Sequence, residues 1–222
     1  MKFAQINYNE KVFTAEVRGD GTLLSSPVRT LIEFVYAHHT SSARYILRQP
    51  IILNYEPSVF EKALIKVAAK RFRIELDQLP ANKVIRCEPL PHEPEEGFDS
   101  LAFNSQAEVI SWVQGEAEKT GVLVAYVSRL HQIIQIAKNS NAVVKTRHAE
   151  MNLLEKLMNI RPQAGDYIVV SLQSCRMCAA ALAEWTGQEN ITVYFLKPEP
   201  ALTNVKTALF GKEKNAFTDL KS

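Results

Sequence analysis

The chain has 222 residues, 46% of them hydrophobic and 23% charged, and its formal net charge at pH 7 is +2. This composition is typical of a globular protein, and the length suffices for one large or two small domains. No apolar run approaches the roughly 20 residues of a membrane-spanning helix. The first residues alternate apolar and polar side chains and lack the apolar core of a signal peptide. We therefore expect a protein that does not enter a membrane and that resides in the cytoplasm.

Three cysteines leave one without a partner, which argues for reduced thiols rather than a disulfide framework. A small net charge by itself does not indicate an extended surface for a polyanion.

A proline-rich acidic segment divides the chain, because residues 88–99 contain three prolines, five acidic residues and no lysine or arginine. Such segments resist packing and form exposed linkers. We predict a small α+β domain of unknown role at 1–87, an acidic linker at 88–100 and a larger domain at 101–222.

The first domain is expected to mix strands and helices. Taken in chain order, its predicted elements are a hairpin from 2–7 and 11–17, a turn at 18–21, a helix at 27–38, a strand-like stretch at 43–55 and a helix at 57–72. Pro50 argues against a central strand in the strand-like stretch. Lys62, Lys66 and Lys70 lie four residues apart on the second helix, where they could contact phosphates. A solvated helix face is the simpler interpretation of this stripe.

Helices and strands alternate more regularly in the second domain. Its predicted elements are a helix at 105–120, strands at 122–128 and 132–138, a helix at 146–157, a strand at 167–172, a helix at 175–185 and a strand at 191–196. No convincing strand follows, and 201–210 is expected to be helical. This order favours a layered α/β domain with some parallel strand pairing.

Two cysteines stand at the start of the helix that follows the strand 167–172. Ser174 is placed to cap this helix, and Cys175 and Cys178 are three residues apart, so that both sulfurs project from one face of the first turn. A helix N-terminus carries partial positive charge and favours thiolates. Two thiolates in this arrangement form half of a zinc site.

A histidine at another helix start can complete the site. His148 precedes Cys175 by enough chain for a helix, a turn and a strand. Three protein ligands leave a fourth position for water, which is typical of a catalytic zinc site, and bound zinc lowers the pKa of that water. Glu150, in the same turn as His148, could carry protons from the water to a ring nitrogen and then to a leaving amine. The sequence therefore predicts hydrolytic deamination.

The motif "HAE" at 148–150, followed by "CRMC" at 175–178, resembles the cytidine deaminase-like superfamily over roughly residues 104–197. The run "SLQSCRMCAAAL" is most similar to the branch with tRNA adenosine deaminases. The resemblance implies a three-layer α/β/α sandwich with a mixed sheet and one Zn²⁺ per chain, held by His148, Cys175 and Cys178. It also implies that Glu150 is the proton shuttle and that the chain self-associates as a dimer or a tetramer, with a homodimer as one candidate state.

The resemblance leaves the substrate open among a free base, a nucleoside, a nucleotide and a base in RNA or DNA. Family members often hold the ribose or the base with an asparagine at the end of the second strand, and Asn139 and Asn141 are the candidates here. The backbone N–H of Ala149, at a helix start, is a further candidate for orienting substrate. Ser174 and Gln173 depart from the proline and glutamate that are usual at these positions.

Two other interpretations come from different classes of protein. A Cys-x-x-Cys between a strand and a helix is also the arrangement of thioredoxin-like redox proteins, although this leaves His148 and Glu150 unexplained. A catalytically silent deaminase-fold binding module would have no chemical use for the Glu150 carboxylate.

Overall fold

The computed structural model describes residues 1–17, 25–75, 83–91, 98–187, 189, 191–200, 206–209 and 211–219. The chain forms two compact units, the first made of Met1–His92 and Asn141–Thr146, the second of Glu93–Ser140 and Arg147–Ser222. The division lies within the predicted linker, but Asn141–Thr146, which we assigned to the second domain, belongs to the first unit. Within the described residues, no helix is both long and apolar enough to cross a membrane.

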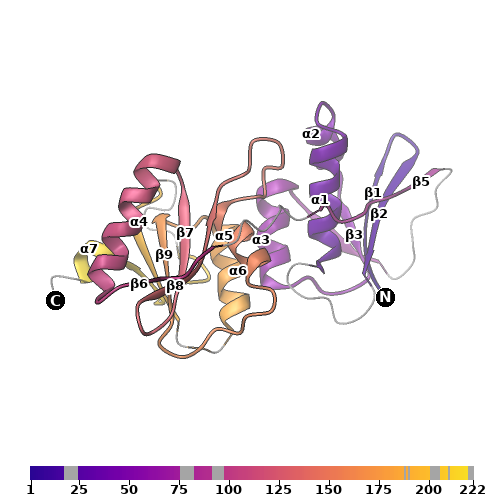
Figure 1. Ribbon diagram of the computed structural model, residues 1–222. Helices are drawn as coiled ribbons and strands as arrows, with labels where there is room; N and C mark the ends of the chain where they lie inside the picture. Colours follow the sequence, from indigo (N-terminus) through magenta and orange to yellow (C-terminus); the bar gives the residue numbers. More distant parts are fainter. Residues whose placement is uncertain are drawn as a thin grey trace. The chain divides into compact units, whose positions relative to one another are not determined.

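The first unit is built on a five-stranded sheet with the strand order β4-β3-β1-β2-β5. Its elements are β1 (Lys2–Tyr8), β2 (Lys11–Val17), α1 (Pro27–His38), α2 (Ala43–Ile46), β3 (Ile51–Leu53), α3 (Val59–Ala68), β4 (Phe72–Ile74) and β5 (Lys83–Arg86) (Figure 1). The predicted hairpin is confirmed, with β1 antiparallel to β2. Asn9 and Glu10 turn it with φ of 50° and 62°, which is the left-handed backbone that a two-residue hairpin loop requires.

Local capping explains where the helices of the first unit begin. The Ser26 side chain accepts a hydrogen bond from the backbone N–H of Arg29, and Pro27 occupies the first turn of α1. In α3, Ser58 and Glu61 form a capping box, in which each side chain bonds the other residue's backbone N–H. The helix 57–72 is therefore shorter than predicted, since the cap is at Ser58 and the chain turns into a strand at Phe72.

The stretch 43–55 differs from the prediction in two ways. Ala43–Ile46 is a short helix rather than a strand, and β3 begins directly after Pro50. β3 lies inside the sheet between β4 and β1, so the prediction that Pro50 argues against a central strand in this stretch was wrong. A proline that precedes the first paired residue removes no hydrogen bond from the ladder. The predicted turn at 18–21 lies outside the described residues.

The second unit contains a six-stranded sheet with the order β11-β10-β9-β7-β8-β6. Its elements are β6 (Leu101–Ala102), α4 (Gln106–Thr120), β7 (Leu123–Val127), β8 (Gln132–Lys138), α5 (Ala149–Lys156), β9 (Tyr167–Leu172), α6 (Arg176–Thr186), β10 (Thr192–Lys197), β11 (Glu213–Asn215) and α7 (Ala216–Asp219). β9, β10 and β11 are parallel, whereas β7 runs antiparallel to β8 and β9. The mixed sheet of the α/β fold is therefore as predicted.

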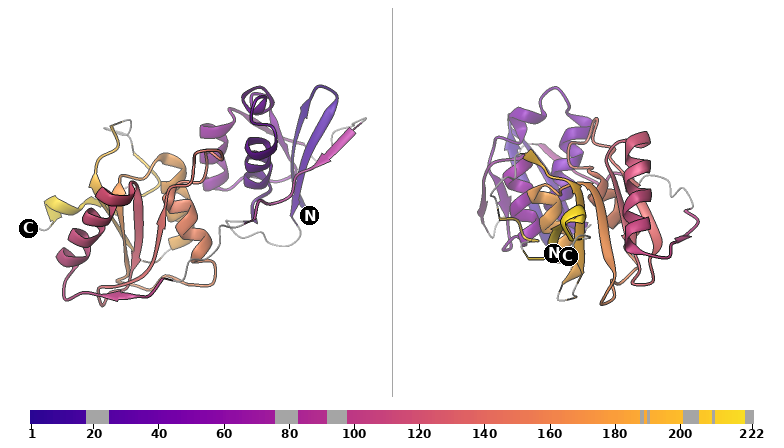
Figure 2. Two further views of the ribbon diagram at one scale, coloured as in Figure 1. Left: turned by 45° about the horizontal axis from the view of Figure 1, so that its top comes forward. Right: turned by 90° about the vertical axis from the view of Figure 1, so that its left-hand side faces the viewer.

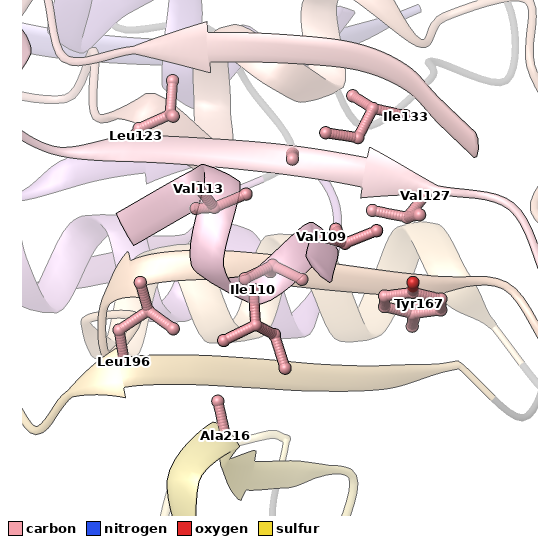
Figure 3. Packing of buried hydrophobic residues seen from close by; sticks show 11 residues of the cluster. Val109, Ile110, Val113, Leu123, Val127, Ile133, Tyr167, Leu196 and Ala216 are labelled. Atoms are coloured by element: carbon pink, nitrogen blue, oxygen red, sulfur yellow. The ribbon is translucent and has the colours of Figure 1, made fainter. Parts of the chain in front are cut away.

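The second unit has three layers, with α4 on one face of the sheet and α5 and α6 on the other (Figure 2). Figure 3 shows how Val109, Ile110 and Val113 of α4 cover the sheet residues that form one apolar core. These buried sheet residues include Leu123, Val127, Ile133, Tyr167 and Leu196. Ser105 caps α4 as predicted, and Gly121 ends it with φ of 87°. The fold class is therefore the three-layer α/β/α sandwich expected from the sequence.

Strand β11 was not predicted. It consists of the three residues Glu213–Asn215 and pairs in parallel with β10. A three-residue strand of polar side chains carries no apolar alternation, so the sequence pattern could not indicate it. The expected helix at 201–210 lies mostly outside the described residues.

Candidate metal and catalytic site

The candidate ligands stand at the starts of two helices in the second unit. His148 is the N-cap residue of α5, and Cys175 is the N-cap residue of α6. Neither side chain caps its helix, because neither accepts a hydrogen bond from the first turn. Cys178 follows in the first turn of α6 and is completely buried. Both helices therefore begin with polar side chains that do not serve as caps.

The three side chains converge. His148 Nδ1 lies 3.6 Å from Cys175 Sγ and 3.5 Å from Cys178 Sγ, and all three ligand atoms are within 4.8 Å of one another. Zinc bonds of about 2.3 Å to sulfur and about 2.0–2.1 Å to nitrogen at a tetrahedral angle would separate nitrogen from sulfur by about 3.6 Å. The residues present thus fit a zinc ion in both chemistry and spacing.

The two thiols have opposite acidities. The pKa of Cys175 is lowered to about 4, chiefly by a hydrogen bond from Cys178 and also by His148, against the opposing effect of burial. The pKa of Cys178 is raised well above its ordinary value by burial and then by the Cys175 thiolate. One thiolate is therefore already present at neutral pH in this pair. Thiolate is the form of cysteine that binds metals.

Glu150 lies in the first turn of α5 and is 5% exposed. Its pKa is raised, first by burial and then by the negative charge of Cys175. The backbone of α5, the Ser174 hydroxyl and His148 act in the opposite direction. A carboxyl group with a raised pKa exchanges protons more readily near neutral pH than an ordinary glutamate does, which is the property that a proton shuttle needs.

Ser174 is not the N-cap of α6, contrary to the sequence prediction. The N-cap of α6 is Cys175 rather than Ser174, because the helix begins one residue later than predicted. The Ser174 hydroxyl is completely buried. It lowers the pKa of Glu150 but makes no well-oriented hydrogen bond within the described part of the chain. Sequence reasoning therefore missed that Ser174 belongs to the surroundings of Glu150.

Two of the predicted substrate-binding groups contact each other. The backbone N–H of Ala149 donates a hydrogen bond of 2.7 Å to Asn139 Oδ1, so Asn139 bridges the end of β8 and the start of α5. Asn139 is exposed, and its Nδ2 makes no hydrogen bond to the part of the chain that the structure describes. Asn139 can therefore offer a donor beside His148. Asn141 lies in the segment that belongs to the first unit.

Asn152 is a residue of this region that the sequence analysis did not single out. It is 5% exposed, and its Nδ2 donates to the Lys138 carbonyl at 2.7 Å and to the Ser140 hydroxyl at 2.9 Å. These bonds hold the residues on either side of Asn139. In the sequence, only the position of Asn152 could have indicated that it lies near the site. It follows His148 by one helical turn and interrupts the otherwise apolar run "MNLL".

Residues 116–219 match the model of a family described as Bd3614-like deaminase. The second unit is therefore similar to a deaminase domain, and we refer to it as the deaminase domain after this likeness. The matched residues make up just under half of the chain and include all four motif residues of the site. None of the curated proteins compared with the chain matches it.

Distant likenesses to solved structures were also found for the deaminase domain. One is a tRNA:A34 deaminase of the wobble position, at 20% identity over 43% of this chain and 76% of that chain, with a TM-score of 0.33. A guanine deaminase from Nitrosomonas europaea is 14% identical over 55% and 74% of the two chains, with a TM-score of 0.36. A dCMP deaminase from the cyanophage S-TIM5 is 17% identical over 46% and 92%, with a TM-score of 0.34.

Proposed function

We propose that the deaminase domain is a zinc-dependent hydrolase that removes the exocyclic amine of a nucleobase. The observation that carries this proposal is the approach of His148 Nδ1 to both sulfurs, at 3.6 and 3.5 Å, next to a buried carboxyl group in the same helical turn. The match to the Bd3614-like deaminase model supports the same reaction class. His148, Cys175 and Cys178 are the proposed ligands, with one zinc ion per chain.

Zinc bound to three protein ligands supplies a Lewis acid and makes a water molecule acidic enough to lose a proton near neutral pH. The chain's own residues supply the proton transfers. Glu150 would take a proton from the attacking water and deliver it to a ring nitrogen of the base. It would then take the remaining proton of the new C–OH group and deliver it to the amine, so that ammonia leaves as the carbonyl forms. Its raised pKa suits both steps, because the group can accept and release a proton in the same pH range.

Asn139 is the proposed substrate-orienting residue. Its Oδ1 is fixed by the Ala149 N–H, which leaves the Nδ2 donor for an acceptor on the base or the sugar. Ala149 therefore acts on substrate through Asn139 in this proposal. Asn141, the other candidate from the sequence, stays a prediction.

The substrate class follows from the reaction and remains broad. Free bases, nucleosides, nucleotides and bases in RNA or DNA all present an amine on an amidine-like carbon, and a base in nucleic acid must be unstacked before it enters a pocket. The tRNA:A34, guanine and dCMP deaminases act on three of these classes. Cytoplasmic location and homodimer formation stay predictions.

The decisive experiment is an ammonia-release screen of the zinc-loaded protein against bases, nucleosides, nucleotides, RNA and DNA. On the substrate found, Glu150→Gln should retain zinc and lose at least about a hundredfold in turnover, the usual size of a general acid/base contribution. Glu155→Gln, the same substitution on the same helix, is the matched control and should stay active. A Glu150→Gln protein that turns over at the wild-type rate would refute the proton-transfer role.

The redox interpretation predicts a different outcome. A thioredoxin-like pair would cycle between two thiols and a Cys175–Cys178 disulfide without bound metal. Purified protein that contains no zinc and reduces a disulfide substrate would favour that interpretation over deamination.

A further inference from the structure

The two residues directly before the proposed metal ligand Cys175 are Gln173 and Ser174, and they are tied to the neighbouring strands of the second unit. The Gln173 backbone N–H donates a hydrogen bond of 2.8 Å to the Lys197 carbonyl, and the Gln173 side-chain oxygen accepts one of 3.2 Å from the Glu199 N–H. These bonds connect the chain that follows β9 to the end of β10. The side-chain N–H group of Gln173 has a different partner.

The partner of this group is Glu213, the first residue of β11. Gln173 Nε2 donates a hydrogen bond of 3.0 Å to Glu213 Oε2. Burial raises the pKa of Glu213, whereas the Gln173 side chain and the Ser174 backbone N–H act in the opposite direction. Donors that favour the charged form of a carboxylate in this way lie beside it. The Glu213 carboxylate therefore faces both residues that precede Cys175.

The stability of the fold does not explain this carboxylate. Glu213 Oε1 is buried and makes no well-oriented hydrogen bond to any residue that the structure describes. A buried polar atom in that state destabilises the folded chain, and such atoms are few in native proteins. An apolar side chain in the same place would avoid this cost. The carboxylate is therefore better explained by the turn that it holds.

This turn leads directly into the proposed ligand. Cys175 is fixed on its C-terminal side by α6, because its carbonyl accepts a hydrogen bond of 2.8 Å from the Ala179 N–H. On its N-terminal side it depends on Gln173, whose Cα atom lies at most about 7 Å away along the chain. A ligand held in place by its surroundings loses less entropy when it binds a metal.

We propose that Glu213 is a positioning residue for the metal ligand Cys175, and that it acts through the Gln173 side chain and the Ser174 backbone. This inference rests on the proposed function, because it assumes that Cys175 binds zinc. In this role Glu213 touches neither the ion nor the substrate, and it determines how firmly the Cys175 sulfur is held.

The test compares how fast full-length variants release zinc to a chromogenic chelator. Glu213→Leu removes the acceptor at a similar side-chain volume, whereas Glu213→Gln keeps an oxygen that can accept from Gln173 Nε2. Glu118→Leu is the matched control, because Glu118 also accepts a hydrogen bond from a glutamine side chain, that of Gln114 at 3.3 Å. The cobalt-substituted proteins provide a second readout, since their absorption spectra report the geometry of the ligands.

A double-mutant cycle shows whether Glu213 acts through Gln173. Gln173→Leu removes the donor of the same hydrogen bond, so each single variant already loses it. The double variant should therefore release zinc more slowly than the product of the two single effects predicts.

Glu213→Leu should release zinc about tenfold faster than the wild type, the effect expected from the loss of one hydrogen bond to a charged group, with a shifted cobalt spectrum. Glu213→Gln should release zinc more slowly than Glu213→Leu, and Glu118→Leu should match the wild type in both measurements. Equal release rates and identical cobalt spectra for Glu213→Leu and a zinc-loaded wild type, or single effects that simply multiply in the double variant, would overturn this inference alone. A wild-type protein that binds no zinc would overturn the proposed function and this inference with it.

Discussion

Removal of the Asn152 side chain tests whether tertiary contacts hold the part of the candidate site around Asn139. Asn152→Ala abolishes two hydrogen bonds, to the Lys138 carbonyl and to the Ser140 hydroxyl. Each such bond contributes about 1 kcal/mol net to stability, and the lost side-chain packing adds about 1 kcal/mol. The Asn152 Oδ1 atom is buried without a partner in the described part of the chain, and removing this unsatisfied acceptor offsets about 1 kcal/mol of the destabilisation. The free energy of unfolding should therefore fall by about 2 kcal/mol.

The assay is urea unfolding followed by tryptophan fluorescence. Both tryptophans of the chain, Trp112 and Trp185, lie on helices of the deaminase domain, so the signal reports the unfolding of that unit. Gln114→Ala is the control, because Gln114 makes a single exposed hydrogen bond of 3.3 Å to Glu118. This substitution should lower the free energy of unfolding by less than about 0.5 kcal/mol. If Asn152→Ala is no more destabilising than this control, the two bonds do not hold the residues around Asn139.

Two further predictions concern parts of the chain away from the site. Ser105→Ala removes the side chain that accepts from the Glu108 N–H at the start of α4, and it should destabilise the deaminase domain by about 1 kcal/mol in the same urea assay; an unchanged midpoint would contradict the capping role. Burial raises the pKa of Cys87 to about 12. At pH 8 this thiol should therefore stay protonated, and iodoacetamide should modify it at least about a hundredfold more slowly in the folded protein than in urea. Equal rates of Cys87 modification in the folded protein and in urea, measured by peptide mass spectrometry, would contradict the raised pKa.

The elements that the sequence predicted well are those with a strong local signal. The hairpin 2–17, the helix from Pro27 to His38 and the strands and helices that surround the motif all show clear periodicity or capping residues. The short helix Ala43–Ile46 and strand β11 were missed because four and three residues are too few for a period to appear. Their conformations are set by what packs against them.

The candidate site shows the same division. The spacing of His148, Glu150, Cys175 and Cys178 was enough to predict that the three ligand side chains converge, because helix starts after strands meet at one edge of a sheet. The contacts of Asn139 with Ala149 and of Asn152 with Ser140 are tertiary, and no sequence spacing indicates them. The assignment of Asn141–Thr146 to the first unit is likewise invisible in a sequence pattern, because it rests on tertiary contacts such as the hydrogen bond from Thr146 to Glu33, more than a hundred residues earlier.

The most direct test of the metal site is zinc X-ray absorption on the purified full-length protein. We predict about one zinc per chain, with two sulfur neighbours at about 2.3 Å and two nitrogen or oxygen neighbours at about 2.0–2.1 Å, because one imidazole and two thiolates leave one position for solvent. A shell of three or four sulfurs, or a protein that binds no zinc, would contradict the three-ligand site from which deamination is inferred.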